Sequence, residues 1–162
     1  MTRHFILALI TFLSACNPSH KKSTKEILEQ KAFYYYDNNT YSEAINYFDK
    51  LIALDSTNGE YYFKRAYCYD KTSLKKHAVL DFEKAASLKY EAADAFKNIG
   101  LIAMEVDEDS IALTYFDKGL KIDPSKFKDF GPIIQACKKQ IEFQKTDAWK
   151  EFEEYKKRTK QN

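Results

Sequence analysis

Apolar residues recur every three or four positions along most of this chain, which is the spacing of an amphipathic helix. Only 4 Gly and 3 Pro occur in 162 residues, so little of the sequence is suited to long loops. Three Ser or Thr residues are each followed three positions later by Glu, the spacing that satisfies free amides at a helix start. These signals predict an all-α chain with helices at about 24–37, 41–55, 58–72, 74–89, 93–106, 108–122, 131–145 and 147–159.

Residues 1–15 follow a different pattern. A basic start at Arg3 precedes a nearly continuous apolar run from Phe5 to Leu13. A run of nine residues forms about 14 Å of helix, which cannot cross a hydrocarbon core of roughly 30 Å. The run therefore predicts the apolar region of a cleaved secretory signal and not a membrane-spanning helix.

The end of that run resembles the lipobox of bacterial lipoproteins. Leu13, Ser14 and Ala15 supply one aliphatic and two small residues, and Cys16 supplies a thiol that becomes a thioether to diacylglycerol. The resemblance implies a lipoprotein signal peptide that ends at Ala15, a lipid on Cys16 and a short tether over residues 16–24. The alternative is an ordinary cleaved signal with a chance cysteine after it.

The lipid anchor would set the location of the mature chain. It implies a protein of the cell envelope that is attached to a membrane and faces the periplasm or the exterior. Asn17 stands where Asp would retain a lipoprotein at the inner membrane in enteric-type sorting. The outer membrane is therefore favoured over the inner membrane.

A 34-residue period runs through the middle of the chain. Small, aromatic and basic residues return at this interval, and a large apolar residue closes each unit. A period of this length indicates stacked supersecondary units, each burying one face against the next. The matching positions are Ala44, Ala78 and Ala112; Phe48, Phe82 and Phe116; Lys50, Lys84 and Lys118; Ala32, Ala66 and Gly100; and Leu54, Leu88 and Ile122.

The order of large, small and aromatic positions resembles the tetratricopeptide repeat. The resemblance implies a right-handed α-solenoid of three helix pairs, in which small residues let two backbones approach and aromatic side chains fill the space beside them. Lys31 and Arg65 depart from the motif, which has Leu at their position. The resemblance covers residues 25–126 as the three units 25–58, 59–92 and 93–126.

Residues 127–162 do not repeat the motif. Gly131-Pro132 predicts a helix start, because Pro is tolerated in the first turn of a helix. An apolar stripe then runs through both C-terminal helices, from Ile134 to Tyr155. Such a stripe predicts a capping helix or helices that cover the open end of the solenoid and keep a solvated outer face.

Charge and side-chain chemistry exclude several functions. The formal charge of +2 lacks the basic excess of a nucleic-acid-binding protein. After the signal only His20 and His77 remain as histidines, neither at a metal-ligand spacing, and no catalytic or phosphate-binding motif occurs. We expect no enzymatic activity, no cofactor and no metal. Cys68 and Cys137 lie two repeats apart, so we expect buried thiols and no disulfide.

The resemblance also indicates which residues line the concave groove of the solenoid. They lie on the first helix of each unit and face away from its partner helix. Large apolar residues exposed on such a surface usually mark an interaction site. The groove is thus assigned to Phe33, Tyr36, Phe63, Tyr67, Lys97, Leu101 and Met104, with Phe33 and Tyr67 placed outside the core.

Chaperone-binding members of the family hold a C-terminal carboxylate with a clamp of Lys and Asn. Glu29, Phe33 and Lys64 stand at the matching places, so that clamp is absent. The sequence thus favours a lipid-anchored scaffold that binds an apolar or aromatic segment of a protein or peptide, as an accessory or assembly factor of a cell-envelope complex. The alternative is a self-associating structural subunit that pairs through its C-terminal helix, and the sequence leaves the oligomeric state open.

The lipobox generates a direct prediction. Replacing Cys16 by Ala removes the only sulfur that the lipid could be attached to at this site, so Cys16→Ala should leave the chain unprocessed or release it from the membrane fraction. Metabolic labelling with a fatty-acid probe, followed by fractionation, measures both effects. Retention of the label by Cys16→Ala would show that lipid is attached elsewhere.

Overall fold

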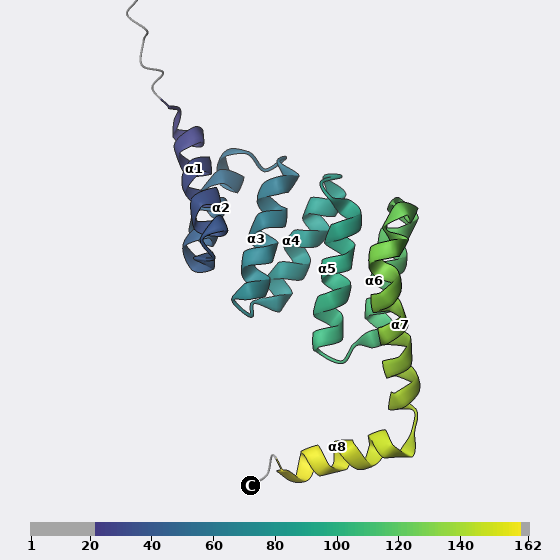
Figure 1. Ribbon diagram of the computed structural model, residues 1–162. Coiled ribbons are helices and arrows are strands. Elements are labelled where there is room, and N and C mark those ends of the chain that lie inside the picture. The colour runs from purple at the N-terminus through teal and green to yellow at the C-terminus, as the bar shows by residue number, and fades with distance from the viewer. Residues whose placement is uncertain (1–21, 160–162) are drawn as a thin grey trace, which may run out of the picture.

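The computed structural model describes residues 22–159, and the predicted signal and Cys16 lie outside them. Within these residues the chain folds into α-helices and one short 3-10 helix, so the all-α prediction is confirmed (Figure 1). None of the described helices is long and apolar enough to cross a membrane. The elements are α1 (Thr24–Asp37), α2 (Tyr41–Leu54), α3 (Gly59–Lys71), α4 (Lys75–Ser87), α5 (Ala92–Glu105), α6 (Asp109–Ile122), η1 (Pro124–Lys126), α7 (Phe127–Gln144) and α8 (Asp147–Thr159).

The first six helices form three antiparallel pairs, α1–α2, α3–α4 and α5–α6, which stack in chain order (Figure 1). The tight turn inside each pair uses one residue in the left-handed backbone region. These residues are Asn39, Ser73 and Asp107, with φ of 58°, 63° and 61°. They lie 34 residues apart, so the period that the sequence shows in its side chains is also present in the backbone.

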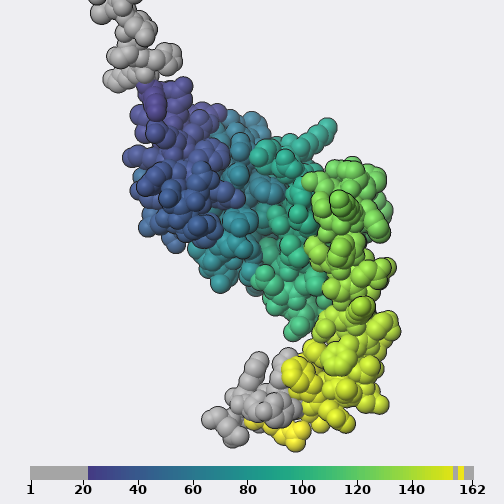
Figure 2. Space-filling view, viewed as in Figure 1, coloured from purple at the N-terminus to yellow at the C-terminus, as the bar shows by residue number. Residues whose placement is uncertain are grey.

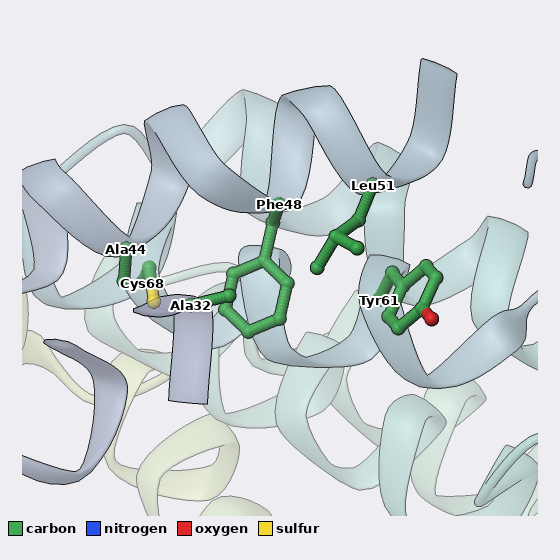
Figure 3. Packing of buried hydrophobic residues seen from close by; sticks show 6 residues of the cluster. All are labelled: Ala32, Ala44, Phe48, Leu51, Tyr61 and Cys68. Carbon is green, nitrogen blue, oxygen red and sulfur yellow. The ribbon is translucent and has the colours of Figure 1, made fainter. Parts of the chain in front are cut away.

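Each pair is held together where a small residue lets a phenylalanine from the second helix fill the space between the helices. Ala44 and Phe48 on α2 are fully buried, and so are Ala32 on α1 and Cys68 on α3. Figure 3 shows Phe48 and Leu51 pointing from α2 toward these residues. The first pair and the helix that follows it therefore share one core.

The third pair shows how little space this arrangement leaves. A Cβ atom placed on Gly100 of α5 would lie 2.5 Å from the ring of Phe116, which is itself fully buried. Side-chain carbons do not approach so closely, so the ring occupies the volume that any side chain at residue 100 would need. Glycine is required here by packing.

One arginine links the first two pairs. The Arg65 guanidinium on α3 donates to Asp81 of its own pair at 2.6 Å and to Asp49 of the preceding pair at 2.6 Å. Asp81 is buried, so its charge depends on this partner. The departure from the motif at residue 65 thus replaces an apolar contact with an ionic connection between neighbouring repeats.

The predicted start of the seventh helix at Gly131-Pro132 is wrong. The helix begins at Phe127, and Pro132 lies inside it. The reason is Phe130, which is fully buried and packs against Phe116 of α6. That contact requires the first turn of α7 to be helical. The stabilisation from burying Phe130 exceeds the cost of the backbone hydrogen bond that Pro132 cannot donate.

The prediction of a C-terminal cap holds for α7 and fails for α8. Cys137 of α7 is fully buried against α6, where its thiol donates to the Asp109 carbonyl oxygen at 3.2 Å. α8 turns away from α7 and lies apart from the stacked pairs (Figures 1 and 2). Ala148 and Phe152 of its apolar stripe are exposed. The polar turn between α7 and α8 separates the two halves of the stripe.

The two cysteines of the described chain behave as predicted. Cys68 and Cys137 are both buried and form no disulfide. Burial raises the pKa of the Cys68 thiol to about 12 and that of the Cys137 thiol to about 11. Both therefore act as small hydrophobic residues near neutral pH.

The packing predicts that an added side chain is costly at one position of α6 and harmless at another. Ala112 is fully buried between the helices of the third pair, so Ala112→Leu should lower the free energy of unfolding by about 1–3 kcal/mol. Thr114→Leu introduces the same residue on the exposed side of α6 and should change it by less than about 0.5 kcal/mol. Urea melts measure both, and coincident curves would contradict this packing.

Candidate functional site

The seven residues assigned to the groove lie on α1, α3 and α5, and all are half-buried. They divide into three kinds. Phe33, Phe63 and Met104 pack against the buried core, Lys97 is engaged in an ion pair, and Tyr36, Tyr67 and Leu101 line a cavity or pack beside it. The contacts of each kind determine which of these side chains are accessible to a ligand.

Phe33 is not part of the buried core, as expected, but it is half-buried and packs against that core. Its ring meets the buried ring of Phe48 edge to face, with centroids 5.7 Å apart. Phe63 in the second pair makes the same kind of contact with Phe82 at 5.2 Å, and a further one with Tyr90 at 5.7 Å. Both side chains therefore support the helix pairs, and a large part of each ring is unavailable to a ligand.

Three tyrosines connect the first two pairs beside the groove. The ring of Tyr67 on α3 lies 5.5 Å from Tyr36 of α1 and 6.0 Å from Tyr41 of α2. Lys64 lies over the Tyr36 ring at 4.5 Å, and Lys71 lies over the Tyr67 ring at 5.0 Å. Burial raises the pKa of Tyr36 above its ordinary value, so its hydroxyl stays protonated. The result is an aromatic surface edged by two ammonium groups.

A cavity of about 210 Å³ opens between α3 and α5. Tyr67 and Leu101, which the sequence placed one period apart in the groove, both line it. Phe82 and Ile102 are buried, and they form the apolar part of its wall. The remaining lining residues are the polar Asp70, Lys71, Asn98 and Glu105.

A charged network borders this cavity. Lys75, the first residue of α4, contacts Asp70 at 2.6 Å and Glu105 at 2.5 Å. Asp70 also lies 3.7 Å from Lys71. Because Asp70 is on α3 and Glu105 is on α5, Lys75 connects the two helices that form the cavity. Two carboxylates and two ammonium groups balance, so the border is polar without net charge.

Lys97 has a structural partner. Its ammonium donates to Asp94 at 3.0 Å, and Lys126 of the 3-10 helix donates to the same carboxylate at 2.7 Å. Burial of Asp94 opposes its ionisation, but the hydrogen bonds from the two lysines outweigh burial and lower the pKa of the carboxyl. Lys97 thus has a structural role at the end of the third pair, where it and Lys126 share one carboxylate.

Sequence reasoning missed Lys75 and Phe82 as residues of the site. Phe82 belongs to the recurring core series, which gives no sign that one side of the residue reaches a cavity. Lys75 acts across the turn between α3 and α4, so no helical spacing connects it with Asp70 or Glu105. Asp70 and Glu105 lie in the last turns of α3 and α5, but they are 35 residues apart, so they stand one position apart in the 34-residue repeat.

The described residues contain no group of three or more His, Cys, Asp or Glu side chains that could hold a metal ion. The cavity itself is lined by aromatic, aliphatic and paired charged groups. The cavity thus combines an apolar wall with a polar border.

The tetratricopeptide repeat family model matches residues 26–58 and 59–91 of the chain. These residues span the first two helix pairs, so the first two of the three predicted repeats are confirmed, and the third predicted unit, 93–126, lies outside the match. DnaJ homolog subfamily C member 3 of Gallus gallus is 29% identical over 124 residues, which cover 75% of this chain and 25% of the relative. The chain thus spans about a quarter of the length of this curated relative. Repeats of this kind generally serve as protein-interaction scaffolds.

Solved structures show the same fold. The Yersinia enterocolitica type III secretion chaperone SycD, solved with a peptide of the translocator YopD, has a TM-score of 0.65 at 16% identity and covers 78% of this chain and 98% of its own. The first TPR of Spaghetti (RPAP3), bound to an HSP90 peptide, has a TM-score of 0.63 at 20% identity. That likeness covers 72% of this chain and 92% of the other.

The position of Phe33 leads to a prediction that separates core from groove. Phe33→Ala should lower the free energy of unfolding by about 1–3 kcal/mol, less than a fully buried Phe, because the ring is half-buried against Phe48. Tyr34→Ala, at the next residue of α1, removes an exposed ring and should cost clearly less. Thermal or urea melts of both variants measure this. If the two variants are equally stable, the Phe33 ring does not stabilise the helix pair and the packing role assigned to it is wrong.

Proposed function

We propose that this tetratricopeptide repeat protein is a membrane-anchored scaffold that binds a protein or peptide in its concave groove, as an accessory or assembly factor of a cell-envelope complex. The observation that carries the proposal is the cavity between α3 and α5, at the place where the repeat puts ligand-facing residues. The α3 and α5 side chains that line it come from consecutive repeats. A ligand there would be held by two units whose relative position the core fixes.

The chemistry of the cavity indicates the ligand. Tyr67, Phe82, Leu101 and Ile102 provide an apolar wall, and its volume of about 210 Å³ suits one large side chain more than a small molecule. Aromatic and large aliphatic anchors in such pockets usually dominate the affinity of a protein interface. We infer a peptide segment that inserts one aromatic or aliphatic residue.

Polar groups around the cavity would orient the rest of the segment. Lys71 and Asn98 can donate hydrogen bonds to carbonyl oxygens of an extended peptide, and Asp70 and Glu105 can accept from its amides. Because Lys75 balances the two carboxylates, this border selects by hydrogen bonding more than by charge. An internal segment fits such a border, since it offers backbone groups and no terminal carboxylate.

The comparisons support binding of a peptide. SycD and the Spaghetti domain were each solved with a bound peptide, as their descriptions state. Their sequences are distant, so they support the mode of binding and do not identify a ligand. The chaperone-type carboxylate clamp is not expected here, because Glu29, Phe33 and Lys64 occupy its places.

Membrane attachment rests on the sequence pattern that ends at Cys16. Cys16 and Thr24, the first residue of α1, are eight residue steps apart, and a fully extended chain spans at most roughly 29 Å between them. A lipid on Cys16 would therefore keep the repeats close to the bilayer, in the periplasm or outside the cell. The outer membrane remains favoured by Asn17.

Site-specific photocrosslinking in cells tests the groove. Benzoylphenylalanine in place of Lys71, at the edge of the cavity, should capture a partner when the full-length chain is irradiated. The same group in place of Ser87, exposed on α4 away from the cavity lining, should not capture it. Adding Leu101→Gln to the Lys71 probe should reduce the adduct at least tenfold, because the apolar wall of the cavity is lost.

Circular dichroism of the Leu101→Gln chain must show unchanged helix content for this comparison to count. If the adducts from residues 71 and 87 are the same, or if Leu101→Gln leaves the adduct intact, the partner binds elsewhere and the groove proposal fails.

A further inference from the structure

The N-terminal end of the solenoid presents a stacking surface that the other repeats bury. Ile27, Lys31 and Tyr34 of α1 lie one period before Tyr61, Arg65 and Cys68 of α3, and two periods before Ala95, Ile99 and Ile102 of α5. In α3 and α5 these positions face the preceding helix pair. Tyr61 and Cys68 are 1% and 0% exposed, whereas Ile27 and Tyr34 are 43% and 62% exposed.

This surface is also shaped to receive a helix. Ile27, Gln30, Lys31, Tyr34 and Tyr35 line an open hollow of about 380 Å³ along α1. We call it the α1 end face. The opposite end of the solenoid differs, because α7 covers it and turns the exposed polar Gln135, Lys138 and Glu142 outward. The C-terminal end of the repeat array is therefore covered by a helix with a polar outer side. The α1 end exposes large residues at positions that are buried in the later repeats.

The repeats also show which charge an occupant of the α1 end face must carry. Arg65 occupies in α3 the position that Lys31 occupies in α1, and it donates to Asp49 on the preceding pair at 2.6 Å. Lys31 already lies over the Tyr47 ring of its own pair, at 5.6 Å. By analogy with Arg65, its ammonium is placed to pair with a carboxylate of a helix that packs on α1. The occupant is thus an amphipathic helix with an acidic residue beside its apolar side.

α8 of this chain has these properties. Ala148, Trp149 and Phe152 fall on one side of the helix, Ala148 is exposed and Phe152 is 46% exposed. The exposed Glu151 flanks that side. α8 has 13 residues and α1 has 14, so both are about 20 Å long at 1.5 Å per residue. A helix of this length can cover the whole α1 end face.

We propose that α8 of one copy packs on the α1 end face of a second copy, with Glu151 placed near Lys31. α1 and α8 are at opposite ends of the helix array, and α8 lies apart from the stacked pairs and runs back beneath them (Figure 1). In the proposed dimer a twofold axis relates the two copies, so each α8 packs on the α1 end face of the other copy. The contact then closes as a dimer and does not continue into a fibre.

Disulfide trapping between two differently tagged full-length chains in mild detergent tests the contact. One chain carries Lys31→Cys and the other Glu151→Cys. The native Cys68 and Cys137 are buried and should not interfere. Oxidation of the mixture should give a cross-linked species that carries both tags, and oxidation of either chain alone should give none beyond the unsubstituted control. Because each chain has one new thiol, the mixed product requires two copies.

The controls distinguish the other possible occupants. Self-cross-linking of the Lys31→Cys chain would show α1 packed on α1, and self-cross-linking of the Glu151→Cys chain would show α8 packed on α8. Either result overturns the proposal. No mixed product, together with a monomer mass by light scattering, overturns it as well, as expected if another segment or partner covers the α1 end face.

A second variant tests the surface without new thiols. Tyr34 is exposed in the single chain, so Tyr34→Glu should keep the thermal melt and raise the dissociation constant of the dimer at least tenfold. Tyr34→Phe should preserve the dimer. An unchanged dimer in Tyr34→Glu would contradict the contact. Lys71 and Leu101 are not part of this surface, so the result is independent of the groove experiment.

Discussion

The close approach of two helices at small residues is the constraint on which the rest of this structure depends. Ala44, Ala78 and Ala112 are each fully buried, and a phenylalanine four residues later on the same helix fills the space beside the contact. The ring of Phe116 occupies the volume of a side chain at residue 100, so the third pair could not close without glycine. The same small-residue and phenylalanine contact recurs in every pair, and the stacking of the pairs brings α3 and α5 together around the cavity.

Most of the fold could be predicted from the sequence, because packing and capping signals coincide. Helices α1 to α6 begin and end within two residues of the predicted limits. The period fails after residue 126, and the error there has a physical cause. In the sequence Phe130 is one of many apolar residues. Its burial against Phe116 requires helix before Pro132, so α7 begins earlier than predicted, at Phe127. The direction of α8 was not predictable, since an apolar stripe does not specify which surface it covers.

The site was predictable at the level of helices and less so at the level of side chains. Phe33 and Tyr67 occupy the same place in successive repeats, but Phe33 packs on Phe48 while Tyr67 borders a cavity with Leu101. A repeat defines the backbone position of a residue. The direction of an aromatic ring depends on the neighbouring volume, which changes from repeat to repeat. Lys97 is a second example: the sequence placed it among the ligand-facing residues, and the nearby carboxylate of Asp94 sets the direction of its side chain.

The burial of Cys68 and Cys137 has a consequence for how the chain could mature. A thiol reacts with oxidants as its thiolate, and pKa values of about 12 and about 11 leave almost no thiolate at neutral pH. In an oxidising compartment the folded chain would therefore be chemically inert at both sulfur atoms. The unfolded chain has no such protection. Both thiols would be open to oxidation only until the core closes, so rapid folding from local contacts would protect them.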